Sequence, residues 1–212
     1  MMKTSTRTLL TVLLIAALVN FTSCSAKASA AQTGDAGAAN TGEADGAAMP
    51  ALSQNESDNI ASLGKLGFHI FPQPVELPAF TLTALEGADL KSADLAGTIT
   101  VLNFWATWCP PCKQEMPSIQ RLKDLMKGSA FRIVAVSTGE AKKTVRDFIA
   151  KNKYTYPVYL DEKGSLGSSY ASQGIPTTYI LDKTGRIVAG VVGGREYDDA
   201  ALVLILKAMA AQ

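Results

Sequence analysis

The sequence predicts an α/β domain with a mixed central sheet flanked by helices, and two observations support this class. Residues 98–105 (TITVLNFW) and 131–138 (FRIVAVST) are continuous apolar runs, which are typical of strands buried on both faces. Each run is followed by a segment with helical spacing of its apolar residues, and the chain closes with a hairpin and a last helix. This order favours a sheet that contains both parallel and antiparallel pairs.

The expected elements follow one another from about residue 80 to the C-terminus. Pro117 lies inside the first long helix, where a proline is expected to cause a kink. The elements are a strand at 80–85, the strand at 98–105, a helix at 110–127, the strand at 131–138, a helix at 144–152, a short strand at 157–161, a hairpin of 177–182 with 186–191, and a helix at 200–209.

The first residues have the pattern of an export signal. Lys3 and Arg7 precede the apolar run of residues 9–19 (LLTVLLIAALV). This run is too short for an ordinary membrane-spanning helix and fits the core of a signal peptide. We therefore expect residues 1–23 to be a signal peptide and the folded part to lie outside the cytoplasm.

The end of this signal can be interpreted in three ways. Residues 21–24 (FTSC) are similar to a bacterial lipobox, so we expect Cys24 to be the lipidated first residue of the mature protein. Ordinary cleavage after residues 28–30 (ASA) and an uncleaved anchor stay open as alternatives. Residues 24–58 are mostly small and polar and have no apolar period, which predicts a disordered tether before a domain at 59–212.

Composition excludes some classes of function. The formal net charge is +1 and there is no basic run, so the sequence has no electrostatic footprint for nucleic acid. Three cysteines are too few for a scaffold held together by disulfides.

Cys109 and Cys112 lie where the first buried strand meets the following helix. Pro110 suits the first helical position, so Cys109 is at the helix N-terminus, where the dipole and free N–H groups stabilise a thiolate. Pro111 has no N–H, so we expect the N–H of Cys112 to support this thiolate. Cys109 is therefore expected to be the attacking thiol, and the more buried Cys112 the resolving thiol.

Other chemistry for this cysteine pair lacks the residues that it needs. A tetrahedral zinc site requires four ligands, and the only histidine, His69, lies some forty residues upstream. A copper-delivery protein would space its thiols more widely and add a histidine in the C-terminal half. A peroxide-reducing site would have Thr or Ser three residues before Cys109, where this chain has Ala106. We expect neither a metal nor a cofactor.

Residues 101–117 (VLNFWATWCPPCKQEMP) and 174–182 (GIPTTYILD) resemble the thioredoxin superfamily, and more narrowly its membrane-tethered TlpA/ResA group of thiol–disulfide oxidoreductases. The combination of WCxxC at a strand–helix junction with a downstream Ile-Pro-Thr is specific. The resemblance covers roughly residues 75–212. It implies a thioredoxin-like fold with an added N-terminal β-hairpin.

The resemblance also implies how a substrate would bind. Pro176 is expected to be cis and to lie against the two cysteines, and the backbone of Ile175 to pair with the incoming chain. Trp108, next to the first cysteine, is expected to be exposed and, with Pro110 and Pro111, to face the substrate.

A proton carrier is also needed, because Asn103 stands where cytoplasmic thioredoxins have a buried Asp, and an amide cannot serve this role. Residues 136–145 (VSTGEAKKTV) are similar to the ResA stretch in which a Glu lies near the thiols. This points to Glu140 for acid–base work, with a pKa raised by burial and a nearby thiolate. The alternative is that Glu140 caps the helix that begins near Lys142.

The resemblance implies a reductase that acts outside the cytoplasmic membrane on disulfides of exported proteins, apocytochrome c among them. A transmembrane donor of the CcdA/DsbD type would re-reduce it, and the lipid at Cys24 would hold it at the membrane. An oxidase or isomerase of the same fold stays open. From another class, so does a redox-inert binding module, although the intact CxxC and Ile175-Pro176 argue against it.

Overall fold

The computed structural model describes residues 52–212. The expected signal peptide, Cys24 and most of the expected tether lie outside the described residues. Helix α1 (Gln54–Lys65) includes residues 54–58, which were expected to belong to the tether. The side chain of Ser53 caps this helix by accepting from the N–H of Glu56. In the part of the chain that the structure describes, no helix is both long and apolar enough to cross a membrane.

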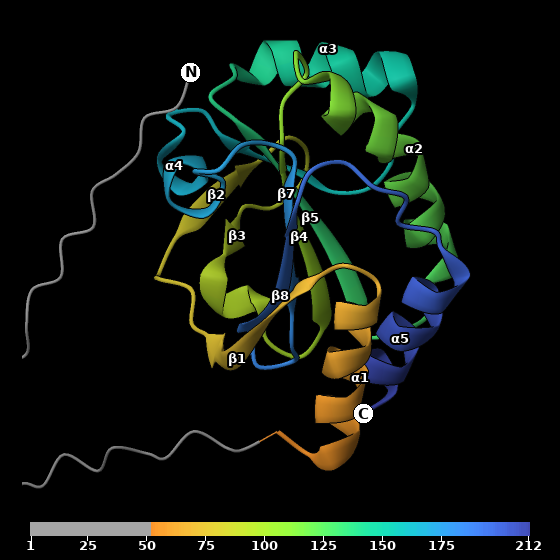
Figure 1. Cartoon of the computed structure of the whole chain (residues 1–212). Coiled ribbons are helices and arrows are strands. Elements are labelled where there is room, and N and C mark those ends of the chain that lie inside the picture. Colours follow the sequence, from red (N-terminus) through yellow and green to blue (C-terminus); the bar gives the residue numbers. More distant parts are fainter. Residues whose placement is uncertain (1–51) are drawn as a thin grey trace, which may run out of the picture. The chain divides into compact units, whose positions relative to one another are not determined.

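The described residues form an eight-stranded mixed sheet with helices on both faces (Figure 1). After α1 the elements are β1 (His69–Val75), β2 (Thr81–Ala84), β3 (Leu90–Lys91), the 3₁₀-helix η1 (Ser92–Leu95), β4 (Ile99–Trp105), α2 (Pro110–Leu125), β5 (Phe131–Thr138), α3 (Lys142–Asn152), β6 (Val158–Asp161), α4 (Ser165–Tyr170), β7 (Thr177–Leu181), β8 (Ile187–Val192) and α5 (Ala200–Ala211).

Strand β4 lies in the middle of the sheet, whose order is β1-β8-β7-β4-β5-β6-β2-β3. It is parallel to β5 and antiparallel to β7, and all of its residues are buried, as its apolar run predicts. The mixed α/β class is therefore confirmed. The expected N-terminal hairpin is also present, because β2 and β3 pair in antiparallel at one edge of the sheet.

Strand β1, at the other edge, was not expected. It pairs antiparallel with β8, and its register is irregular between Ile70 and Val75. Pro72 and Pro74 fall within it, and prolines are tolerated at an edge because they need not donate to a neighbouring strand. Because two prolines are unusual within a strand, the sequence pattern did not predict β1.

Each face of the sheet has its own core. The larger core is covered by α1, α2, α3 and α5, and it contains Trp105 and both cysteines of the CxxC pair. The smaller core lies on the other face, under η1 and α4. Helices α1 and α5 lie side by side along the first of these faces (Figure 1). Pro117 is accommodated within α2, which runs without interruption from Pro110 to Leu125.

Candidate active site

The two cysteines lie where the central strand passes into α2. Cys109 is the N-cap residue of α2 and has extended backbone angles, and Pro110 follows at the first helical position. The two sulfur atoms are joined in a disulfide with an S–S distance of 2.09 Å. The N–H of Cys112 points at the sulfur of Cys109, 3.3 Å away. The expected support for the Cys109 thiolate from the helix N-terminus is therefore in place.

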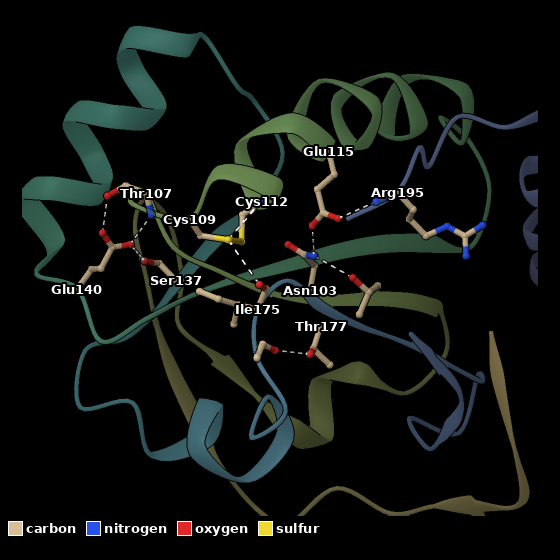
Figure 2. Close-up of a disulfide and its surroundings, with 12 residues drawn as sticks. Asn103, Thr107, Cys109, Cys112, Glu115, Ser137, Glu140, Ile175, Thr177 and Arg195 are labelled. Carbon is tan, nitrogen blue, oxygen red and sulfur yellow. Dashed lines mark hydrogen bonds between the residues drawn. A yellow bond between two sulfur atoms is a disulfide. The ribbon is translucent and has the colours of Figure 1, made fainter. Parts of the chain in front are cut away.

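The Ile175–Pro176 peptide bond is cis and lies against this pair. The sulfur of Cys109 is 3.6 Å from the carbonyl oxygen of Ile175 (Figure 2). Strand β7 begins directly after this bond and is paired with β4, so the central sheet places the proline loop next to the CxxC motif. The cis bond thus lies beside the cysteines as expected, and the role of Ile175 and Pro176 in substrate binding stays a prediction.

The surface around Cys109 is accessible and partly apolar. Trp108 is 66% exposed, and both Pro110 and Pro111 are exposed. Ile175 is half-buried, so it can contact both the core and an incoming chain. Cys109 itself is only 3% exposed and Cys112 is fully buried, in the order expected for an attacking and a resolving thiol.

Glu115, one helical turn after Cys112, is a buried carboxyl that the sequence analysis did not identify. It is 1% exposed. Its Oε1 accepts from the side-chain amide of Asn103 at 2.7 Å, and its Oε2 accepts from the backbone N–H of Arg195 at 3.4 Å. Burial raises the pKa of Glu115 to about 7, although these two contacts and the charge of Arg195 act to lower it. A carboxyl with such a pKa can exchange a proton at neutral pH.

Asn103 is part of a polar network under Glu115. Its amide also donates to the hydroxyl of Thr178 at 2.8 Å, and the hydroxyl of Tyr197 donates to the same oxygen at 2.6 Å. Thr178 lies directly opposite Asn103 in the β4–β7 pair. Asn103 therefore does not carry a proton itself; it holds the group that can.

Glu140 lies on the other side of the disulfide from Glu115 (Figure 2). Its carboxylate accepts from the backbone N–H of Thr107 and from the hydroxyl of Ser137, each at 2.8 Å, and also from the hydroxyl of Thr107. It does not cap α3, because the N–H of Lys142 donates to Glu162 instead. Glu140 thus fixes the loop that leads into Cys109, and its acid–base role stays a prediction.

Two features of the sequence could have identified Glu115. It is three residues after Cys112 and four before Ile119, so it falls on the apolar stripe of α2 that faces the core. A charged residue on such a stripe is buried at a cost unless it is paired or neutral. Arg195 and Thr178 gave no signal of this kind, because only the fold brings them to the site.

The site offers no set of metal ligands. Within residues 52–212, no group of three or more His, Cys, Asp or Glu side chains is arranged to hold a metal ion.

A disulfide-forming pair at a helix N-terminus, beside a cis-proline on a mixed thioredoxin-like sheet, defines a thiol–disulfide oxidoreductase. The chain belongs to the AhpC/TSA family, whose model matches residues 75–189.

Individual relatives are consistent with this class. The chain is 34% identical to the thiol-disulfide oxidoreductase ResA of Bacillus cereus over 118 residues, which cover 56% of this chain and 68% of ResA. It is 36% identical to the sporulation thiol-disulfide oxidoreductase A of Bacillus subtilis over 124 residues, 57% of this chain and 74% of that protein.

Solved structures share the fold. The crystal structure of StoA from Bacillus subtilis superimposes with a TM-score of 0.54 at 32% identity, over 62% of this chain and 99% of StoA. A putative thiol:disulfide interchange protein DsbE from Chlorobium tepidum gives a TM-score of 0.59 at 29% identity, over 66% of this chain and 99% of that chain. The thioredoxin-like fold and the oxidoreductase class are thereby confirmed.

Proposed function

We propose that this oxidoreductase is an exported, membrane-tethered reductase of protein disulfides. The observation that carries the dithiol chemistry, in either direction, is the buried Glu115 carboxyl one turn after Cys112, whose pKa of about 7 would let it take up the proton of the resolving thiol. Export and tethering are supported by the basic and apolar N-terminal pattern and by the lipobox-like FTSC at Cys24.

The reaction would proceed through a mixed disulfide. The Cys109 thiolate attacks one sulfur of the substrate disulfide, and the other substrate sulfur leaves as a thiolate. Cys112 then gives its proton to Glu115 and attacks the sulfur of Cys109, which releases the second substrate thiol. Two electrons pass to the substrate, and the enzyme is left with its Cys109–Cys112 disulfide.

The substrate would approach as an extended chain. Its backbone would pair with Ile175, and its side chains would contact Trp108, Pro110 and Pro111, which are exposed around the sulfur. Trp108 offers a large apolar area next to the reacting bond. Such a surface suits a partly unfolded exported protein, and apocytochrome c with oxidised haem-binding cysteines fits this description.

The direction of electron flow and the partners rest on the resemblance to the tethered TlpA/ResA group. A transmembrane dithiol carrier of the CcdA/DsbD type would return the protein to its reduced state, and lipidation at Cys24 would keep it within reach of that carrier. Each cycle would then move two electrons outward across the membrane to exported proteins.

The in-cell redox state of the pair tests the direction. Cells are quenched with acid, and free thiols are alkylated with a reagent that changes electrophoretic mobility. A reductase is expected to be mostly reduced at Cys109 and Cys112, because its donor must keep it ready to attack. A pair that is mostly oxidised would instead indicate an oxidase. The Cys24→Ala variant tests the anchor separately, through loss of fatty-acid labelling.

A further inference from the structure

The loop of residues 193–197, between β8 and α5, touches both the CxxC motif and the cis-proline. The N–H of Gly193 donates to the carbonyl oxygen of Pro176 at 2.8 Å. A Cβ placed on Gly194 would lie 3.0 Å from the carbonyl oxygen of Pro111. The 193–197 loop therefore lies directly on the CxxC turn, and a side chain at position 194 would crowd the Pro111 carbonyl.

Arg195 in this loop has contacts in two directions. Its backbone N–H donates to the Glu115 carboxylate at 3.4 Å. Its guanidinium donates through Nη1 to the carbonyl oxygen of Leu66 at 3.2 Å, and Cζ lies 4.1 Å from the ring centroid of Phe68. One residue thus touches both the buried carboxylate and the turn between α1 and β1.

The turn of residues 66–68 is suited to hold a guanidinium. Leu66 is the C-cap residue of α1, where carbonyl groups lack helical partners and the helix dipole favours a cation. Phe68 is 4% exposed, so its ring is fixed by the core and presents a rigid face for a cation–π contact. These two contacts fix the side chain of Arg195 from outside the active site.

We propose that Arg195 is a positioning residue that links the 66–68 turn to the Glu115 carboxylate, so that the unit of α1 and β1 helps to set the reactivity of the dithiol. Arg195 and the 66–68 turn both lie outside the family match at residues 75–189. It rests on the thiol–disulfide chemistry of the site and holds for either direction of electron flow.

Several elements present groups to Glu115. Asn103 faces it from β4, Tyr156 from the segment before β6, and Arg195 and Tyr197 from the connection between β8 and α5. Arg195 brings a positive charge and an N–H donor, and both lower the pKa of Glu115 against the effect of burial. Freeing Arg195 from the 66–68 turn would weaken both contributions, and the pKa of Glu115 would rise.

The test measures the titration of Glu115 in the full chain. The carboxyl carbon of Glu115 is followed by NMR in glutamate-labelled, oxidised protein, where the thiols do not titrate, and it is assigned as the signal missing in Glu115→Gln. We expect Arg195→Gln to raise the midpoint by roughly half to one pH unit, because the variant loses a positive charge that favours the ionised carboxylate. Phe68→Leu, which keeps an apolar side chain, should raise it less.

Two further variants test whether the effect is specific to Arg195 and whether it needs the guanidinium group. Arg121→Gln removes another arginine bound to the same connection, through Glu196 and Asp198 on the surface, and should leave the midpoint unchanged. Arg195→Lys keeps the charge without the planar guanidinium and should restore only part of the wild-type value.

An unchanged midpoint in Arg195→Gln would overturn the proposal, as would an equal rise in Arg121→Gln. Full restoration by Arg195→Lys together with no effect of Phe68→Leu would show that charge alone acts and would overturn the link to the 66–68 turn. Far-UV circular dichroism of each variant confirms that the fold is intact. The oxidoreductase class itself is checked independently by insulin reduction with wild-type protein, so its failure would be seen separately.

Discussion

Replacing Glu115 by glutamine should remove a pH-dependent loss of stability. Glu115 is 1% exposed, and burial raises its pKa from its ordinary value of 4.5 to about 7. The folded protein therefore binds the carboxyl proton more tightly than the unfolded chain does. A raised pKa contributes stability that is complete below the unfolded value, and this contribution is lost as the pH rises through the folded value.

The size of the effect follows from the two pKa values. Each pKa unit corresponds to about 1.4 kcal/mol. Because the unfolded chain loses the Glu115 proton at a lower pH than the folded protein does, the free energy of unfolding should fall by about 2–3 kcal/mol between pH 5 and pH 8. Glutamine cannot ionise, and it can still accept from Asn103. Its second contact, with the N–H of Arg195, is lost at all pH values at a cost of about 1 kcal/mol.

The assay is urea unfolding of the oxidised protein at several pH values from 5 to 8, in which the disulfide removes thiol titration. The difference in unfolding free energy between Glu115→Gln and wild type should change by about 2–3 kcal/mol in favour of the variant as the pH rises. Subtracting the wild-type value from that of the variant cancels the contributions of all other groups, because these titrate in both proteins. Glu196→Gln, which removes an exposed carboxyl in an ion pair with Arg121, should show no such change.

A difference between Glu115→Gln and wild type that stays constant from pH 5 to pH 8 would refute the reasoning. Such a result would mean that Glu115 is ionised in the folded protein throughout this range. It would then be unable to take up the proton of Cys112 near neutral pH, and the acid–base role of Glu115 would fall with it.

Three other outcomes are expected. Cys112→Ser should accumulate a mixed disulfide with a substrate protein through Cys109, while Cys109→Ser should accumulate none; trapping of both to the same extent on non-reducing gels would contradict these roles. Glu140→Gln should shift the thiol titration and slow insulin reduction severalfold, because the loop before Cys109 loses its anchor, and unchanged kinetics would exclude that role. Gly194→Ala should slow the same reaction by about tenfold, because its Cβ would approach the Pro111 carbonyl oxygen at 3.0 Å; full activity would show that the loop can shift freely.

Much of the fold could be predicted because its buried strands have clear local patterns. Residues 98–105 and 131–138 became β4 and β5, since strands covered on both faces need continuous apolar side chains. Helix α1 was missed because its exposed surface is polar and only Ile60 and Leu63 are buried, so its composition resembles that of a tether. Its stability comes from packing against the rest of the domain, which no local pattern records.

The site was predictable only where its residues are close in sequence. Cys109, Cys112 and Trp108 lie within one motif, and the Ile175-Pro176 pair could be added through the resemblance. The contact between Arg195 and Glu115 spans 80 residues, and it exists only because the connection between β8 and α5 lies against α2. Long-range hydrogen bonds of this kind leave no periodic trace in the sequence.

This chain has Asn103 where cytoplasmic thioredoxins have a buried Asp. The two carboxyl groups on either side of the dithiol explain why an amide suits this position. Three donors from Thr107 and Ser137 hold Glu140 in one place, an arrangement that fixes the approach to Cys109. Glu115 is instead held by Asn103 in a buried position, and this burial raises its pKa to about 7. An aspartate at position 103 would place a second carboxylate against Glu115, and two such groups cannot both ionise at that distance. An amide at this position therefore lets the Glu115 carboxyl, one turn after Cys112, change its protonation state near neutral pH with no second carboxylate against it.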